Sequence, residues 1–253
     1  VIQFNLRSLF SVAFRHCTLW KADRSPACRA VMMAIDAMNL SLSEIDIDLD
    51  KLEHTTDEMV MNPLQTLPVF KDRELILNDS HAICSYLVSR YCLADYLLPK
   101  DPGGRSLVDQ CLHYNGGVLY PRFRAAAYPI LYDNRDTMMP QQICDIECAY
   151  SDLEVMLKDR MWYGGVWPTL GDIAFASTVS TLNILVPIDE HRFPKLSSWL
   201  YRISKEPFYI TGNCAGLEEF SKRLDHGVFT DECKLTCPRT SCRRRAIAEK
   251  SCT

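Results

Sequence analysis

Two pairs of neighbouring residues could together bind and activate a small peptide that carries a thiol. Asp79 and Ser80 begin an apolar helical pattern, where a carboxylate and a hydroxyl beside free N–H groups can bind the amine and carboxylate of an amino acid. Ser25 stands directly before Pro26, which suits the first position of another helix. Its hydroxyl therefore lies beside a second set of unpaired N–H groups, where a thiolate could be held. The two pairs together indicate a thiol peptide with a zwitterionic end.

The elements that must position these residues follow the order of a thioredoxin-like domain. The apolar periods predict strands over 16–22 and 41–49, a helix from Pro26, an irregular helix within 50–61, a hairpin over 67–77 and a helix over 80–91. In this order Pro68 begins a strand after a bend, where such folds carry a cis peptide. The bend would present the backbone of Leu67 to a bound peptide. The alternative is an ordinary turn proline.

A breaker cluster separates this first unit from a helical second unit. Residues 98–104, with two prolines and two glycines, form the predicted linker. Beyond it, helices are predicted over 108–132 with a kink at Pro121, over 140–158, after a capping box at Thr169 and Asp172, near Pro194, and over 217–224. We therefore assign 1–15 to an extra segment outside the fold, 16–97 to the thioredoxin-like domain, 105–226 to the helical domain and 227–253 to a basic tail without a structural period.

Six short motifs occur in a fixed order along about 200 residues of the chain. They are Asp23-Arg24-Ser25-Pro26, Asn62-Pro63, Leu67-Pro68-Val69, Asp79-Ser80-His81-Ala82-Ile83, Leu170-Gly171-Asp172-Ile173 and Val186-Pro187-Ile188-Asp189. In this order they resemble the cytosolic glutathione transferases, and the residues of the motifs are most similar to those of the insect epsilon class. The resemblance implies an α+β thioredoxin-like domain followed by an all-α domain. It also implies a dimeric, cytoplasmic enzyme that uses glutathione as co-substrate and holds no permanent cofactor.

The resemblance assigns roles to the residues of the first domain. Ser25 would donate a hydrogen bond to the sulfur of glutathione, acting neither as nucleophile nor as base. The remaining glutathione-binding residues would be Pro26, His54, Gln65, Leu67, Pro68, Asp79, Ser80 and Arg124. The alternative is that Ser25 and Asp79 only cap their helices. His81 is expected to pack or to form a hydrogen bond, because a lone histidine on a helix is seldom a general base.

One position departs from the family pattern. Gln65 stands where the family commonly has a histidine that reaches the glycine carboxylate of glutathione. A neutral amide can still donate a hydrogen bond, but it lacks the assistance of a charge. Binding at the glycine end would then be weaker, or would depend on His54 and Arg124.

A second, apolar substrate is indicated by residues four apart on the helix after the linker. Tyr120, Arg124, Tyr128 and Tyr132 share one stripe, and by resemblance the last three fall at positions that line the epsilon-class hydrophobic pocket. Phe208 and Tyr209 are expected as further walls of this pocket. The alternative is that the stripe belongs to the core. The predicted function is conjugation of glutathione to small hydrophobic electrophiles. Two alternatives stay open, a carrier of hydrophobic ligands and a steroid-pathway transferase of the same fold.

Composition excludes several other classes of protein. The chain has 253 residues, 47% of them hydrophobic, with a net charge of −4 and no basic footprint for nucleic acid. No apolar run reaches the eighteen or so residues of a membrane span. Of twelve cysteines, eight are scattered through apolar patterns, which indicates the reduced state of a cytoplasmic protein. The other four, in the tail, lack the spacing of zinc ligands, so no metal is predicted.

Overall fold

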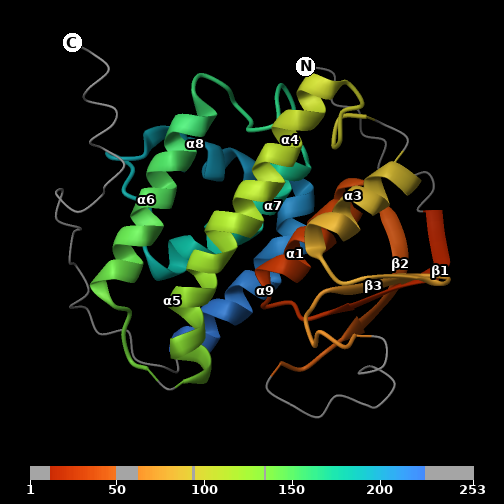
Figure 1. The fold of residues 1–253 in the computed structure, drawn as a ribbon, viewed down its shortest axis with the longest axis horizontal. Coiled ribbons are helices and arrows are strands. Elements are labelled where there is room, and N and C mark those ends of the chain that lie inside the picture. The colour runs from red at the N-terminus through yellow and green to blue at the C-terminus, as the bar shows by residue number, and fades with distance from the viewer. Residues whose placement is uncertain (1–11, 50–61, 93–94, 134, 226–253) are drawn as a thin grey trace.

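The computed structural model describes residues 12–49, 62–92, 95–133 and 135–225. A mixed sheet with two helices forms one side of the molecule, and the remaining helices form a bundle beside it (Figure 1). This is the predicted order of a thioredoxin-like domain followed by an all-α domain. Within the described part of the chain, no helix is both long enough and apolar enough to cross a lipid bilayer.

The sheet has four strands in the order β2-β1-β3-β4. Their bounds are β1 (Val12–Lys21), β2 (Leu40–Asp46), β3 (Val69–Asp72) and β4 (Leu75–Leu77). Strand β1 pairs in parallel with β2 and antiparallel with β3, and β3 and β4 form the predicted hairpin. The predicted boundary at residue 15 is wrong, because β1 starts at Val12 and pairs there with Leu40. The register of β1 against β2 shifts between Phe14 and Thr18, so the strand is irregular there.

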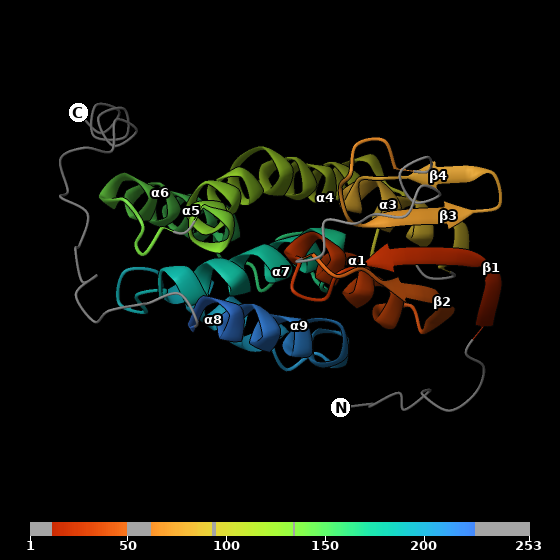
Figure 2. The same ribbon diagram turned by 90° about the horizontal axis from the view of Figure 1, so that it is seen from below.

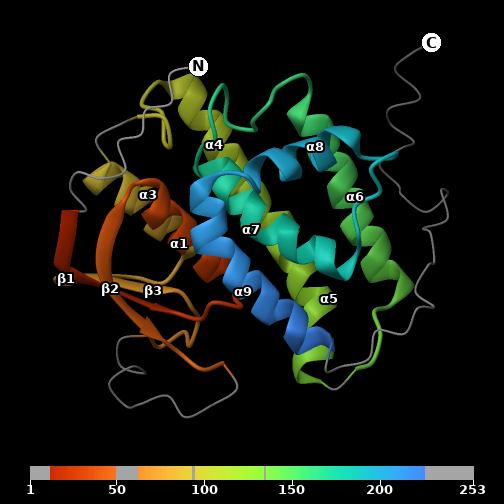
Figure 3. The same ribbon diagram turned by 180° about the vertical axis from the view of Figure 1, so that it is seen from behind.

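Helix α1 (Pro26–Ala37) lies between the sheet and the second domain, and α3 (Ser80–Tyr91) packs beside it (Figure 3). Val31 and Ile35 of α1 are buried in the same apolar core as Leu19 and Phe70 of the sheet. The irregular helix expected within 50–61 lies outside the described residues.

The second domain is built around one almost fully buried helix. Its elements are α4 (Pro102–Tyr114), a single π-helical turn η1 (Asn115–Leu119), α5 (Tyr120–Tyr132), α6 (Pro140–Leu157), α7 (Leu170–Leu185), α8 (Pro194–Ile203) and α9 (Pro207–Asp225). Helix α7 runs through the centre of these helices (Figure 2). The predicted capping box at its start is confirmed, since Asp172 accepts hydrogen bonds from the N–H groups of Thr169 at 3.0 Å and Tyr163 at 2.8 Å.

The predicted linker extends too far toward the C-terminus. Pro102 already opens α4, and the side chain of Asp101 caps it by accepting the N–H of Gly104 at 2.6 Å. Gly103 and Gly104, which predicted a break between elements, lie in the first turn of α4 and allow it to pack closely. A Cβ atom on Gly104 would come within 2.9 Å of the Cβ atom of Pro99.

The helix predicted over 108–132 is interrupted more strongly than a proline kink. Between α4 and α5 the chain makes the turn η1, where the N–H of Tyr120 donates to the carbonyl of Asn115, five residues earlier. Pro121 has no N–H to donate and its ring would clash with the carbonyl four residues before it. A wide π turn accommodates both effects.

The last helix is longer than predicted because its glycines obscure the helical pattern. Gly212 and Gly216 lie on the face of α9 that meets α1. A Cβ atom on Gly216 would lie 2.0 Å from the carbonyl oxygen of Asp23, and one on Gly212 would lie 2.6 Å from the backbone nitrogen of Met33. These two positions let the backbones of α1 and α9 approach closely, as Figure 3 shows for the helices.

The thiols of the described chain are mostly free, as expected for a reduced protein. The free cysteines are Cys17, Cys28, Cys84, Cys92, Cys111, Cys148 and Cys214.

His81 and Asn115 join the two domains, since α3 belongs to the first and η1 to the second. The Nε2 atom of His81 lies 2.9 Å from the side-chain nitrogen of Asn115. Burial lowers the pKa of His81 from 6.5, the charge of Asp79 opposes this effect, and nearby His113 adds to it. The neutral ring is therefore favoured in the folded protein, which agrees with the hydrogen-bonding role expected for this residue.

We expect Gly216→Ala to reduce the free energy of unfolding by about 1–3 kcal/mol or more, because the methyl group would overlap a backbone carbonyl. Gly117→Ala is the matched control, since a Cβ atom there would meet nothing within 4 Å. Urea unfolding of both variants and the parent protein measures the effect. Equal stability of the two variants would contradict the close contact between α1 and α9.

We expect the free energy of unfolding to fall less in mild acid for His81→Gln than for the parent protein. The folded pKa of His81 lies below the unfolded value, so the unfolded chain takes up the proton first as the pH falls. The contribution of neutral His81 is complete above about pH 6.5 and declines as the pH falls toward the folded pKa. Denaturant unfolding at about pH 7.5 and 5.5 should show a larger decrease for the parent protein than for the variant. Equal decreases would rule out this role.

Candidate functional site

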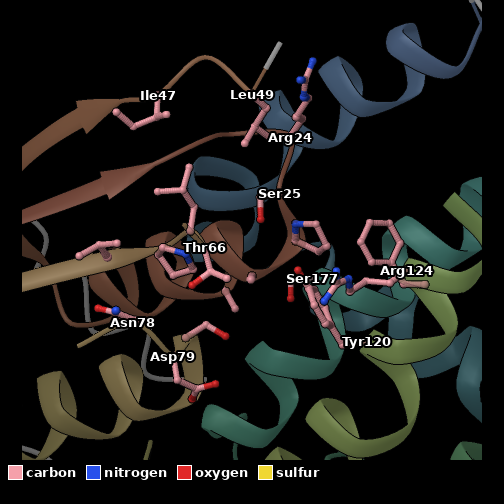
Figure 4. A pocket seen from close by; sticks show the side chains of 18 of the residues that line it. Arg24, Ser25, Ile47, Leu49, Thr66, Asn78, Asp79, Tyr120, Arg124 and Ser177 are labelled. Atoms are coloured by element: carbon pink, nitrogen blue, oxygen red, sulfur yellow. The ribbon is translucent and has the colours of Figure 1, made fainter. Parts of the chain in front are cut away.

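A cavity of about 460 Å³ lies where the first domain meets the helical domain (Figure 4). One wall comes from the turn before α1, the segment before β3 and the start of α3. The other comes from η1, α5, α7 and α9. Nearly all the residues predicted to act in the site reach this cavity: Ser25, Pro26, Gln65, Leu67, Pro68, Asp79, Ser80, Tyr120, Arg124, Tyr128 and Tyr132.

Ser25 is the N-cap of α1 and directs its hydroxyl into the cavity (Figure 4). Its backbone is extended, with φ −75° and ψ 122°, and its oxygen accepts the N–H of Cys28 at 3.5 Å. Pro26 occupies the first helical position, as predicted. A hydroxyl that accepts one hydrogen bond keeps its own proton, so Ser25 can cap the helix and still donate to a ligand.

The turn that carries Ser25 is fixed by a buried ammonium group. Nζ of Lys21 lies 2.6 Å from a carboxylate oxygen of Asp23 and 2.6 Å from one of Asp46. Burial disfavours the charge on Lys21, but these two hydrogen bonds outweigh that effect and raise its pKa. The ion pairs hold the end of β1 against β2 immediately before the turn.

Cys28, the cysteine closest to Ser25 in sequence, is unsuited to act as the nucleophile. Its side chain is fully buried, and burial raises its pKa to about 11. It therefore remains a thiol near neutral pH. A thiolate in this cavity must come from a ligand.

Asp79 is the N-cap of α3, and one oxygen of its carboxylate accepts the N–H of Ala82 at 2.9 Å. Ser80 begins the helix beside it, and both line the cavity. The preceding residue, Asn78, donates to the side chain of Asn62 at 3.3 Å. This contact ties the start of α3 to the turn before β3.

That turn places Gln65 and the Leu67-Pro68 bend at the cavity. Asn62 holds the turn through its side-chain amide, which donates to the carbonyl of Thr66 at 2.7 Å. Gln65 has a positive φ of 51° and an exposed side chain. The Leu67–Pro68 peptide is cis, as predicted. His54, the other residue predicted for this end, lies outside the described residues.

The opposite wall carries the aromatic stripe of α5. Tyr120, Arg124, Tyr128 and Tyr132 all line the cavity from the same helix face. The guanidinium carbon of Arg124 lies 4.7 Å from the centre of the Tyr128 ring, and the rings of Tyr128 and Tyr132 are 5.3 Å apart, edge to face. Burial raises the pKa of Tyr120, so its hydroxyl stays protonated. The wall is aromatic and carries one cation.

Phe208 and Tyr209 do not reach the cavity. Both are buried at the start of α9 and are absent from the described residues that line it. Sequence reasoning placed them before the last helix, whereas they form its first turn, which packs into the core.

Several lining residues were missed. Phe123 and Leu131 line the cavity and lie three residues after Tyr120 and Tyr128, whereas the predicted stripe includes only residues spaced four apart. A helix face includes both spacings, so this signal was available. Ser177 and Phe220 reach the cavity from α7 and α9, and no local pattern indicates that.

The cavity therefore combines three chemical features. A hydroxyl donor at one helix start can stabilise an anion, and a carboxylate with free N–H groups at a second helix start can bind a zwitterion. An aromatic wall faces both from the second domain. A ligand with a polar and an apolar part, or two ligands side by side, would fit this division.

The chain is similar to known proteins in both sequence and fold. Residues 19–94 match the family model of the glutathione S-transferase N-terminal domain. The structure is similar to an epsilon-class glutathione S-transferase from the housefly, Musca domestica, with 32% identity, a TM-score of 0.82, and coverage of 85% of this chain and 99% of that one. A glutathione transferase homologue from Drosophila mojavensis with bound glutathione also has 32% identity, with a TM-score of 0.80 and coverage of 86% and 100%.

A sequence relative extends the comparison over nearly the whole fold. Glutathione S-transferase 1 of Manduca sexta is 40% identical over 202 residues, which cover 79% of this chain and 93% of the relative. The match therefore includes both the thioredoxin-like and the helical domain, and the chain belongs to the glutathione S-transferase family.

Proposed function

We propose that Ser25 activates the thiol of glutathione in this cavity for transfer to small hydrophobic electrophiles. Glutathione conjugation itself follows from membership of the family. The observation that supports the proposal is the position of Ser25, which caps α1 at the same cavity that Asp79 and Ser80 reach from α3.

Activation means lowering the pKa of the bound thiol. A cysteine thiol in water has a pKa near ~8.5, so little thiolate exists at neutral pH. The Ser25 hydroxyl would donate a hydrogen bond to the thiolate, and the start of α1 would add its positive dipole end. The thiol proton leaves to solvent. The thiolate sulfur then forms a bond to the electrophilic carbon, and the electron pair of the broken bond departs with the leaving group.

The remaining polar residues would orient glutathione. The Asp79 carboxylate would bind the ammonium of the γ-glutamyl group, and the hydroxyl and N–H of Ser80 would bind its carboxylate. The backbone of Leu67 would pair with the peptide. Gln65 is exposed at the cavity rim and would donate an uncharged hydrogen bond to the glycine end.

The electrophile would bind against the aromatic wall of α5. Arg124 stacks on Tyr128 there, across the cavity from the residues of the first domain (Figure 4). This position favours contact with the electrophile over contact with the glycine end of glutathione. The residues that α5 contributes to the described cavity include no carboxylate, so this wall does not support the steroid-pathway role.

We further propose a cytoplasmic homodimer. The family resemblance supports this assembly, in which the first domain of one subunit meets the helical domain of the other. The chain also offers exposed apolar side chains on both domains, for example Ile76 and Tyr201.

We expect Ser25→Ala to lower turnover at neutral pH by roughly 100-fold, because the thiolate loses a preorganised donor. The pKa of enzyme-bound glutathione, titrated by ultraviolet absorbance, should rise toward that of the free thiol. Turnover is measured with glutathione and a generic aryl halide. An unchanged pKa of the bound thiol would remove Ser25 from the mechanism.

Two further variants separate this role from helix capping. Ser25→Asp keeps a cap but replaces the donor with a negative charge, so it should be folded and inactive. Ser25→Thr keeps the hydroxyl and should retain more activity than Ser25→Ala. If Ser25→Asp were as active as the parent enzyme, capping alone would explain this serine.

We expect Asp79→Asn to raise the KM for glutathione by roughly 10- to 100-fold, because a charge-assisted hydrogen bond to the ammonium is lost. Asparagine is an equally good N-cap, so α3 should remain stable. Asp101→Asn is the matched control, since Asp101 caps α4 in the same way outside the cavity. Steady-state kinetics would contradict the assignment if both variants changed KM equally.

A further inference from the structure

Three groups with metal-binding atoms meet at the far end of the β1–β3 strand pair. They are the imidazole of His16, the thiol of Cys17 and the carboxylate of Asp72, whose ligand atoms all lie within 4.8 Å of one another. The strand register separates them from the glutathione site. Trp20 pairs with Val69 and both line the cavity, whereas Cys17 pairs with Asp72 three residues further along, a distance of about 10 Å.

Two adjacent residues of β1 approach the same carboxylate where the strand is irregular. Successive side chains of a regular strand point to opposite faces of the sheet. The register of β1 against β2 shifts between Phe14 and Thr18, so His16 and Cys17 lie in a stretch without partners in β2. On the other side of β1, Cys17 pairs with Asp72 of β3. The Nε2 atom of His16 lies 3.5 Å from Asp72 Oδ1.

Asp72 is oriented as a metal ligand would be. Its side chain is only 6% exposed, and its Oδ2 atom accepts hydrogen bonds from the hydroxyls of Tyr86, at 2.7 Å, and Tyr91. Its Oδ1 atom is buried and accepts no hydrogen bond of ordinary geometry within the described part of the chain, with His16 Nε2 as its neighbour at 3.5 Å. A buried carboxylate oxygen without a hydrogen bond is costly, whereas a metal ion would satisfy it. The tyrosines would then act as the outer partners that fix a ligating carboxylate.

We propose that His16, Cys17 and Asp72 bind one zinc ion. Zinc accepts nitrogen, thiolate and carboxylate ligands at about 2.0–2.3 Å in a tetrahedron, which places ligand pairs about 3.3–3.7 Å apart. The 3.5 Å distance from His16 to Asp72 already fits, and the ligand atoms of all three residues lie within 4.8 Å of one another. Water would occupy the fourth position on the side of His16, which is 38% exposed.

Charge and proton balance are consistent with this site. Thiolate and carboxylate together neutralise the two charges of zinc. Burial and the negative charge of Asp72 raise the pKa of Cys17, so the free protein carries a thiol that lies 3.4 Å from the Tyr91 hydroxyl. Binding replaces the thiol proton with zinc and releases that proton to solvent. The ion would join β1 to β3 and stabilise the first domain.

The test uses the full chain with the four tail cysteines, Cys233, Cys237, Cys242 and Cys252, replaced by serine. We expect this protein to bind one equivalent of zinc by calorimetry and to gain thermal stability from it. Cobalt, used as a spectroscopic probe, should give a thiolate-to-metal charge-transfer band. His16→Ala and Cys17→Ser should each weaken zinc binding by at least roughly tenfold and Cys17→Ser should abolish the band.

Matched controls are His191→Ala and Cys214→Ser, which change an exposed histidine and an exposed cysteine elsewhere. Both should bind zinc like the parent. Glutathione turnover reports folding of every variant independently of zinc. The proposal is overturned if the tail-substituted protein binds no stoichiometric zinc, or if His16→Ala and Cys17→Ser bind zinc as tightly as the controls.

Discussion

The close contact between α1 and α9 is the constraint on which the geometry of the active site depends. Gly212 and Gly216 let the two backbones approach to a distance that no larger residue permits. Because α1 is held in this way, its N-cap residue, Ser25, has a fixed position relative to the helical domain. The aromatic wall of α5 belongs to that domain, so one backbone contact sets the spacing between the thiol activator and the surface that receives the electrophile.

A buried arginine makes this contact specific. Arg29 of α1 is fully buried, and its guanidinium donates to Asn213 of α9 at 2.6 Å and Thr181 of α7 at 2.5 Å. Burial lowers its pKa to about 10, which still leaves it charged at neutral pH. No carboxylate of the described chain forms an ion pair with it. A packing of α1 that kept Arg29 buried without these partners would leave a charged donor unsatisfied, at a cost larger than that of a lost apolar contact.

The sequence predicts those structural features that depend on residues close together in the chain, and it does not predict those that depend on distant residues. Helix starts at Pro26, Ser80 and Leu170 were predicted correctly, because caps and N-terminal prolines act within a few residues. The length of α9 was not predicted correctly, because glycine is a poor helix former. Its presence in this helix is explained only by the close approach of the α1 backbone. The lining residues that share one face of α5 were predicted. Ser177 and Phe220, which reach the cavity from α7 and α9, were not predicted.

The two interpretations of Ser25 and Asp79, helix cap and ligand-binding group, are compatible in this structure. Each side chain caps through one acceptor, which leaves the hydroxyl proton of Ser25 and the second oxygen of Asp79 for other partners. A single cap also satisfies only part of a first turn, whose other N–H groups still attract an anion. Asp101 caps α4 by the same chemistry without lining the cavity. The position of a capped helix start at a cavity, and not the cap alone, therefore makes it a binding site.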